Sequence, residues 1–182
     1  FDDLSREGDQ AYFSDGITED ILTRLAQVSG LQVISRTSVM RYKDTEKSIP
    51  EIADELGVRY LLEGSVRKVG DELRISGQLI DARTDEHLWA ESYDRDLTNV
   101  FEIQSEIASE IARALEVRLS EEDRDQLRRG GTDSPLAYDL YLQGRDVMSG
   151  RPGSYEGYLR NVRAARTLLR RALEADSTFA PA

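Results

Sequence analysis

The 182-residue chain is acidic, with 35 Asp and Glu against 24 Lys and Arg. The resulting net charge of −11 argues against a nucleic-acid-binding or membrane-surface protein, because both need clustered basic side chains. The chain has no cysteine, which excludes disulfides, thiolate nucleophiles and cysteine-ligated zinc. Hydrophobic residues make up 39%, enough for a buried core, but no apolar run approaches the roughly 20 residues that cross a bilayer.

A helix followed by a short strand is predicted near the amino terminus. Apolar residues recur at helical spacing from Ile17 to Val28. We place the helix start at Asp15 to Thr18, since either side chain can accept the free amide hydrogens of a first turn. Residues 31–36 are expected to form a strand, with alternate apolar side chains on one face.

A second, shorter helix is predicted from its capping residues. Ser48 and Glu51 have the spacing of a capping box, in which each side chain satisfies an exposed amide of the other. Apolar residues from Ile52 to Leu56 supply one buried face, and Gly57 is expected to end the helix.

Three strands are then predicted to form an antiparallel meander. The first covers residues 59–68, and Gly70-Asp71 offers hairpin turn chemistry. Apolar residues alternate along the second strand from Leu73 to Leu79. Residues 86–94 form the third strand, in which Trp89 is expected to be a core residue.

The next predicted element is a long amphipathic helix over residues 100–115, with Glu102, Glu106 and Glu110 on its polar face. A further helical stretch ends at Gly130-Gly131. Flexible glycines followed by Ser134-Pro135, which favours a helix start, make residues 130–135 the best domain boundary. Beyond it, residues 136–148 and 158–175 are expected to form an antiparallel helical hairpin joined by a turn at residues 149–154.

Three motifs in order resemble the TolB-like amino-terminal domains of bacterial regulators. They are YFSDGITEDI at residues 12–21, LLEGSVR at residues 61–67, and QLIDA at residues 78–82 with EHLWA and YDR shortly after it. The resemblance covers residues 1 to about 118. It implies that Phe1 is the last residue of the family's first strand, and that the truncation leaves an open sheet edge.

The carboxy-terminal hairpin resembles the first unit of a tetratricopeptide (TPR) array. Tyr138, Tyr141 and Gly144 suit the first helix of such a unit, and the second helix keeps the repeat's spacing of small and apolar residues, although the unit is longer than standard. A single repeat cannot bury its stacking face, so Phe179 and the residues after it are expected to lead into a following helix. The apolar stripe from Val162 to Ala172 would then be partly open to that helix.

Together these observations predict an α/β (α+β) domain, with a mixed sheet that includes the meander and with packed helices, followed by an all-α hairpin. The predicted divisions are an α/β domain at residues 1–119, a helical linker at 120–134 and the TPR-like hairpin at 135–182. In proteins with this pair of modules, the resemblance implies an upstream class III adenylate cyclase, winged-helix domain or Ser/Thr kinase, often with an intervening transmembrane helix.

No catalytic, cofactor or metal site is predicted. His87 is the single histidine, which excludes a two-histidine metal site, and we interpret it as a strand residue on the same side as Trp89. A triad of His87 with Ser65 or Ser76 remains compatible with the spacing, but no nucleophile-elbow or phosphate-loop motif is present. The acids Asp15, Glu19 and Asp20 are read as favourable charge near a helix start, with a cation site as the alternative.

The candidate protein interface lies on the carboxy-terminal hairpin. An arginine stripe along its second helix is either a solvated face or a dock for an acidic partner, and the chain's own glutamate face at residues 102–110 is one such partner. Tyrosines of the hairpin are candidate anchors, although packing is their commoner role. The proposed interface residues are Tyr138, Tyr141, Tyr155, Arg160, Arg163, Arg166 and Arg170.

These features favour a non-catalytic regulatory module of a larger bacterial signalling protein, in which the α/β domain senses or scaffolds and the hairpin recruits protein. The alternatives are an envelope assembly protein of the FlgO/CsgG-like type and a small-ligand sensor. Expected partners are proteins, with self-association through open faces and no nucleic acid. A membrane would be reached only through a helix elsewhere in the protein, and a periplasmic location is slightly favoured over the cytoplasm.

Overall fold

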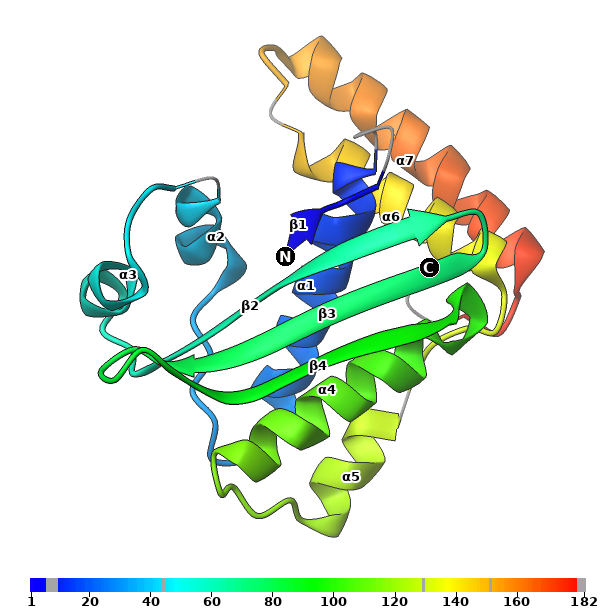
Figure 1. Ribbon diagram of the computed structural model, residues 1–182. Coiled ribbons are helices and arrows are strands. Elements are labelled where there is room, and N and C mark those ends of the chain that lie inside the picture. Colours follow the sequence, from blue (N-terminus) through cyan, green and yellow to red (C-terminus); the bar gives the residue numbers. More distant parts are fainter. Residues whose placement is uncertain (6–9, 44, 129, 151, 180–182) are drawn as a thin grey trace.

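The computed structural model describes residues 1–5, 10–43, 45–128, 130–150 and 152–179 (Figure 1). Four strands and a set of helices form a mixed α/β arrangement. The elements are β1 (Asp2–Asp3), α1 (Ala11–Gln27), α2 (Arg36–Val39), η1 (Met40–Tyr42), α3 (Ile49–Leu56), β2 (Tyr60–Val69), β3 (Glu72–Asp81), β4 (Glu86–Asp96), η2 (Leu97–Asn99), α4 (Val100–Ala114), α5 (Glu121–Arg128), α6 (Pro135–Ser149) and α7 (Tyr155–Ala175).

The sheet has the order β1-β2-β3-β4, and its last three strands form the predicted antiparallel meander. β1 runs parallel to β2 and pairs with it only at Ser65 and Val66. Within the described residues, the remainder of β2, at residues 60–64 and 67–69, therefore has no strand partner on its outer side.

One face of the sheet carries the core. Leu73, Ile75 and Leu79 alternate on β3, and each is at most 2% exposed. They meet α1 and α4, whose apolar residues recur at helical spacing and are buried against them. The amphipathic helix predicted over residues 100–115 is therefore confirmed as α4. No helix in the described ranges is both long enough and apolar enough to span a bilayer.

The first helix begins earlier than expected. α1 starts at Ala11, so Asp15 and Thr18 lie inside the helix, and the Thr18 hydroxyl donates to the carbonyl of Ser14 instead of capping the first turn. The apolar spacing continues backward from Ile17 to Phe13, which is 1% exposed. This additional buried turn extends the helix in front of residues 15–18, where its start was expected.

The strand expected at residues 31–36 is absent. Residues 31–35 have no regular secondary structure, and Arg36 begins the short helix α2. Leu31 and Val33 are partly buried against the core, so their alternation is real. An extended loop with one side against a core shows the same alternation as a strand, and only sheet pairing distinguishes the two.

Capping chemistry is confirmed for α3. The Glu51 carboxylate accepts from the Ser48 amide and hydroxyl at 2.8 and 2.7 Å, which is the carboxylate half of the capping box. Gly57 ends the helix with a φ of 66°, a left-handed conformation that favours glycine.

A bulge in β4 corrects the expected orientation of His87. Trp89 pairs with Leu79, but His87 pairs with the adjacent Ile80, so Leu88 is the extra residue. Because consecutive residues of β3 point to opposite faces, His87 and Trp89 do not share a side as strict alternation predicts. His87 is exposed, whereas Trp89 is half-buried against the core.

The two carboxy-terminal helices form the expected antiparallel hairpin. Ser134 caps α6 by accepting from the Ala137 amide at 3.2 Å, as the Ser-Pro pair predicts. Ala165 and Ala172 of α7 are buried, and Leu169 lies against Gly144 of α6. Part of the apolar stripe of α7 therefore faces α6, while Val162 and Leu169 remain only partly buried. That a following helix covers them stays a prediction.

The chain returns to the core after α7. The Phe179 ring is 0% exposed and packs edge-on against Phe101 and Tyr141, with centroids 6.1 and 5.2 Å away. The expected entrance to a further helix falls mainly on residues 180–182, which lie outside the described residues.

Candidate protein-interaction site

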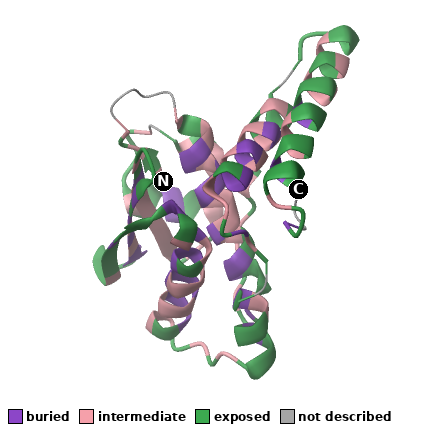
Figure 2. Ribbon diagram, turned by 90° about the vertical axis from the view of Figure 1, so that its right-hand side faces the viewer, coloured by how far each residue is buried: buried purple, intermediate pink, exposed green. Residues whose placement is uncertain are grey.

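The carboxy-terminal hairpin is seated on α1 by close packing. A Cβ atom at Gly16 would lie 2.6 Å from Leu142 Cδ2, so only glycine leaves room for this leucine. Leu142 and Tyr138 of α6 are each 1% exposed and belong to the same apolar cluster as α1 and α4. In Figure 2, buried residues gather where these helices meet, while most of α7 is exposed.

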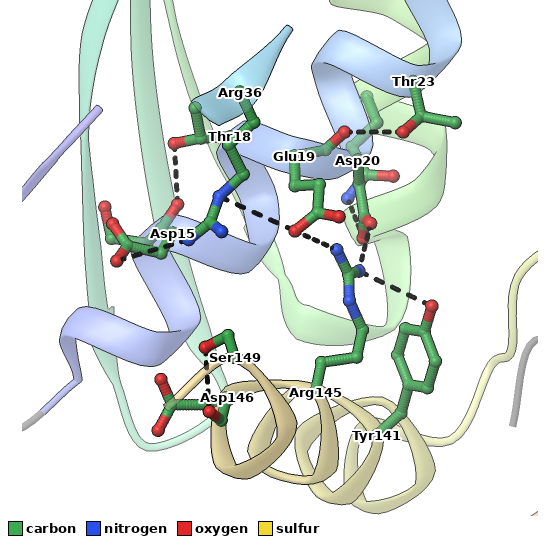
Figure 3. A network of polar contacts seen from close by, with 12 residues as sticks. Asp15, Thr18, Glu19, Asp20, Thr23, Arg36, Tyr141, Arg145, Asp146 and Ser149 are labelled. Carbon is green, nitrogen blue, oxygen red and sulfur yellow. Dashed lines mark hydrogen bonds and ion pairs between the residues drawn. The ribbon is translucent and has the colours of Figure 1, made fainter. Parts of the chain in front are cut away.

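Asp20 of α1 is the main polar contact of this junction. Its carboxylate accepts a hydrogen bond from Tyr138 at 2.7 Å and pairs with Arg145 Nη1 at 2.7 Å. Gln104 of α4 donates to the Tyr138 hydroxyl at 3.1 Å, so three helices meet at one buried network. Figure 3 shows Arg145 reaching from α6 toward the acids of α1, with Tyr141 beside it.

The environment fixes the ionisation of this network. Burial, followed by the charge of Asp20, raises the pKa of the Tyr138 hydroxyl well above its ordinary value, so Tyr138 is a neutral donor. Burial disfavours the charged Arg145 guanidinium, but the charge and hydrogen bond of Asp20 outweigh it and raise the pKa of Arg145. Arg145 therefore stays protonated at the junction.

Glu19 extends the network toward α2. Its Oε2 lies 2.5 Å from Arg145 Nη2 and 3.6 Å from Arg36 Nε. Arg36 also lies 3.8 Å from Asp15 (Figure 3). Asp15 in turn pairs with Lys43 at 2.7 Å. A row of alternating charges thus joins α6, α1, α2 and the segment that follows η1.

A second polar contact lies near the amino-terminal end of α1. Asp139 of α6 pairs with Lys68 of β2 at 2.7 Å and accepts a hydrogen bond from the Tyr12 hydroxyl at 2.9 Å. The Lys68 ammonium also lies 4.8 Å from the Phe13 ring centroid. With a polar contact at both ends and Leu142 between them, the hairpin is held in one orientation.

The acids at residues 15–20 neither lie at a helix start nor form part of a cation site, the two roles considered from the sequence. Since α1 begins at Ala11, none of them lies in its first turn. Within the described residues, no group of three or more metal-ligating side chains gathers here or elsewhere. Asp15, Glu19 and Asp20 instead pair with basic residues from Arg36 to Arg145, contacts that sequence spacing does not reveal.

The seven candidate interface residues separate into two groups. Tyr138 is 1% exposed and hydrogen-bonded, so it is a core residue and cannot anchor a partner. Tyr141 is half-buried between Phe179 and the Arg145 guanidinium. The remaining residues are exposed along α7, namely Tyr155, Arg160, Arg163, Arg166 and Arg170.

The exposed arginines form a basic surface on an acidic protein. Among the described residues, none of these four arginines pairs with an acid, and the glutamates of α4 do not reach them. Glu110 pairs instead with Arg113, one turn along its own helix. We call Arg160, Arg163, Arg166 and Arg170 the α7 arginine face.

A large cleft was not anticipated from the sequence. It has a volume of about 1380 Å³ and lies between α1, the open edge of β2 and the segment from α2 to α3, which we call the arm. Its apolar lining includes Leu22, Leu31, Val33, Met40, Ile52 and Leu62. In the sequence, each of these residues belongs to what looks like an ordinary apolar core face. The cleft becomes visible only in the structure, which keeps these apolar faces apart.

The serine triad left open by the spacing is not assembled. Ser65 and Ser76 are paired in the sheet, and His87 pairs with Ile80. Four residues of strand, roughly 13 Å at the usual rise, separate Ser76 from Ile80. His87 therefore cannot activate either serine.

Comparison with known proteins agrees with a regulatory role. Residues 6–110 match the family model described as HilA/YgeH-like transcriptional regulator, second domain. The whole chain is 42% identical over 182 residues to "Putative adenylate cyclase 3" of Rhizobium meliloti (strain 1021) and spans 30% of that protein's length. The match covers a fragment of that protein and does not identify its catalytic part. The chain belongs to the HilA/YgeH-like transcriptional regulator second-domain family.

Proposed function

We propose that this chain is a non-catalytic protein-interaction module of a larger bacterial signalling protein. In this proposal the sheet and α1 form a TolB-like scaffold, and α6–α7 is the first unit of a TPR-like binding surface. The α7 arginine face binds an acidic segment of a partner protein.

The observation that carries this proposal is the combination of a fixed hairpin with an unpaired basic face. Asp20 and Glu19 hold α6 by ion pairs, and Leu142 seats it against Gly16. α7 packs chiefly on α6 and presents its arginines outward. A rigidly held surface loses little conformational freedom on binding, which favours affinity for a charged partner.

The test compares two arginine-depleted variants. Arg160, Arg163, Arg166 and Arg170 are changed to serine in one, and the exposed Arg113, Arg118 and Arg124 of α4–α5 are changed to serine in the other. Proteins cross-linked to the wild-type chain in its host cells are identified, purified and titrated against each variant by calorimetry. We expect the α7 variant to lose at least about tenfold in affinity and the control to lose little. Equal affinities of the two variants would refute the proposal.

The cleft supports a second candidate function, a small-ligand sensor. Its volume of about 1380 Å³ and its mostly apolar lining are sufficient for an organic metabolite. Ligands would be sought by the rise in melting temperature that they cause, because binding to the folded state alone stabilises it. Met40→Glu places a charge in the cleft wall and should abolish such a rise. A ligand that stabilises wild type and Met40→Glu equally would bind elsewhere.

A further inference from the structure

Glu19 is shared by two arginines from different parts of the molecule. The same oxygen, Oε2, lies 2.5 Å from Arg145 Nη2 on α6 and 3.6 Å from Arg36 Nε on α2. The longer distance exceeds that of a hydrogen bond. Arg36 Nε is also shielded from solvent without a hydrogen-bond partner in the described structure. The two arginines are therefore unequal competitors for one carboxylate.

Arg36 belongs to an element with little other attachment to the core. Neither α2 nor η1 has a buried residue in the described structure, whereas α3 buries Ile52 and Ala53. The first half of the arm is thus held largely by charge, through Arg36 and through the Lys43–Asp15 pair at 2.7 Å. Segments with few buried contacts open most easily.

The same part of the arm forms a wall of the cleft. Val39, Met40 and Lys43 line the cavity on this side, and α1 lines the other. Figure 1 shows the arm on the opposite side of α1 from α7. Glu19 on α1 lies between them and contacts both the arm and α6.

We propose that the arm and the hairpin compete for Glu19, so that outward movement of the arm tightens the docking of α6–α7. While Arg36 is close, it shares the Glu19 carboxylate with Arg145 and its positive charge opposes that of Arg145. When the arm moves outward, as when a ligand enters the cleft, the Glu19 carboxylate pairs with Arg145 alone. The cleft would thereby control the rigidity of the surface assigned above to partner binding.

The test measures hydrogen exchange of α6 amides in variants of the whole chain. Arg36→Gln removes the competing charge, and we expect a roughly two- to fivefold rise in protection along α6, the range expected of one partly exposed ion pair. Arg41→Gln is the matched control in the same arm, because the Arg41 guanidinium contacts Tyr42 and not Glu19. Glu19→Gln should abolish the effect of Arg36→Gln.

The outcomes separate cleanly. Increased protection with Arg36→Gln that disappears in the Glu19→Gln background supports the competition. Unchanged or reduced protection of α6, or the same change with Arg41→Gln, overturns it. The proposal rests on the proposed function only for its biological consequence. Exchange is measured without any partner, so a failed competition leaves the arginine-face experiment unaffected, and the reverse also holds.

Discussion

Replacing Gly16 by alanine is the most direct test of how the hairpin sits on α1. Glycine inside a helix is less favourable than alanine by about 1 kcal/mol, so on a free helix face Gly16→Ala would stabilise the protein by that amount. In the structure the new Cβ would lie 2.6 Å from Leu142 Cδ2, 3.0 Å from Cδ1 and 3.2 Å from Cγ. Rotation of a single methyl group does not relieve three contacts.

The two effects oppose each other, and their magnitudes decide the sign. Overpacking of a close-fitting core costs about 1–3 kcal/mol. After subtraction of the helix gain, we expect Gly16→Ala to destabilise the protein by roughly 0–2 kcal/mol. For a chain of this size, each kcal/mol lowers the melting temperature by about 2–4 °C.

Urea denaturation followed by circular dichroism measures the change, and two further variants identify its cause. Leu142→Ala alone should cost about 2–5 kcal/mol, because the side chain is buried. In that background the clash is gone, so Gly16→Ala should become stabilising. Ala164→Gly, at an exposed position of α7, gives the helix-propensity effect by itself. If Gly16→Ala stabilised the otherwise unchanged protein by about 1 kcal/mol, α6 would not be docked as described.

Three further changes have expected outcomes. Trp89→Ala removes a half-buried ring and should cost less than the roughly 3–5 kcal/mol of a fully buried aromatic, and a melting temperature within a degree of wild type would contradict its core role. Tyr138→Phe removes the donor to Asp20 and should cost about 1–3 kcal/mol in urea denaturation, whereas a neutral result would mean that the hydroxyl is not buried in the network. Hydrogen bonds from the Ser29 amide and from Ser120 hold the pKa of Asp123 well below its ordinary value. The ionised Asp123 therefore stabilises the fold above about pH 4, and this contribution to stability is lost progressively below it. Wild type should lose more stability on acidification than Asp123→Asn, and parallel pH profiles of the two proteins would refute this.

Elements whose causes are local in the chain were predictable. The capping box of α3 needs only Ser48 and Glu51, and the β2–β3 hairpin needs only the turn at Gly70-Asp71. Helix α4 follows from the spacing of its own apolar residues. Each of these signals acts over three or four residues, so a single sequence is sufficient to find it.

Features that depend on distant partners were missed. Tyr138 has the composition of a surface anchor, but its hydroxyl finds Asp20, 118 residues away, and its ring lies within a cluster of other aromatic residues. The β4 bulge depends on how Leu88 is accommodated beside β3, which alternation within β4 cannot show. The cleft likewise depends on where the arm lies relative to β2.

The acids of α1 show why a local explanation can be sufficient for a pattern and still be wrong. Favourable charge at a helix start accounts for Asp15, Glu19 and Asp20 without any partner, and it contributes only a few tenths of a kcal/mol to about 1 kcal/mol. Asp20 is too enclosed for that role, since its side chain is 16% exposed and accepts from both Arg145 and Tyr138. A carboxylate buried to that extent requires compensating charge. The requirement is met by α6, so the same residue that makes α1 costly to bury also determines where the hairpin must dock.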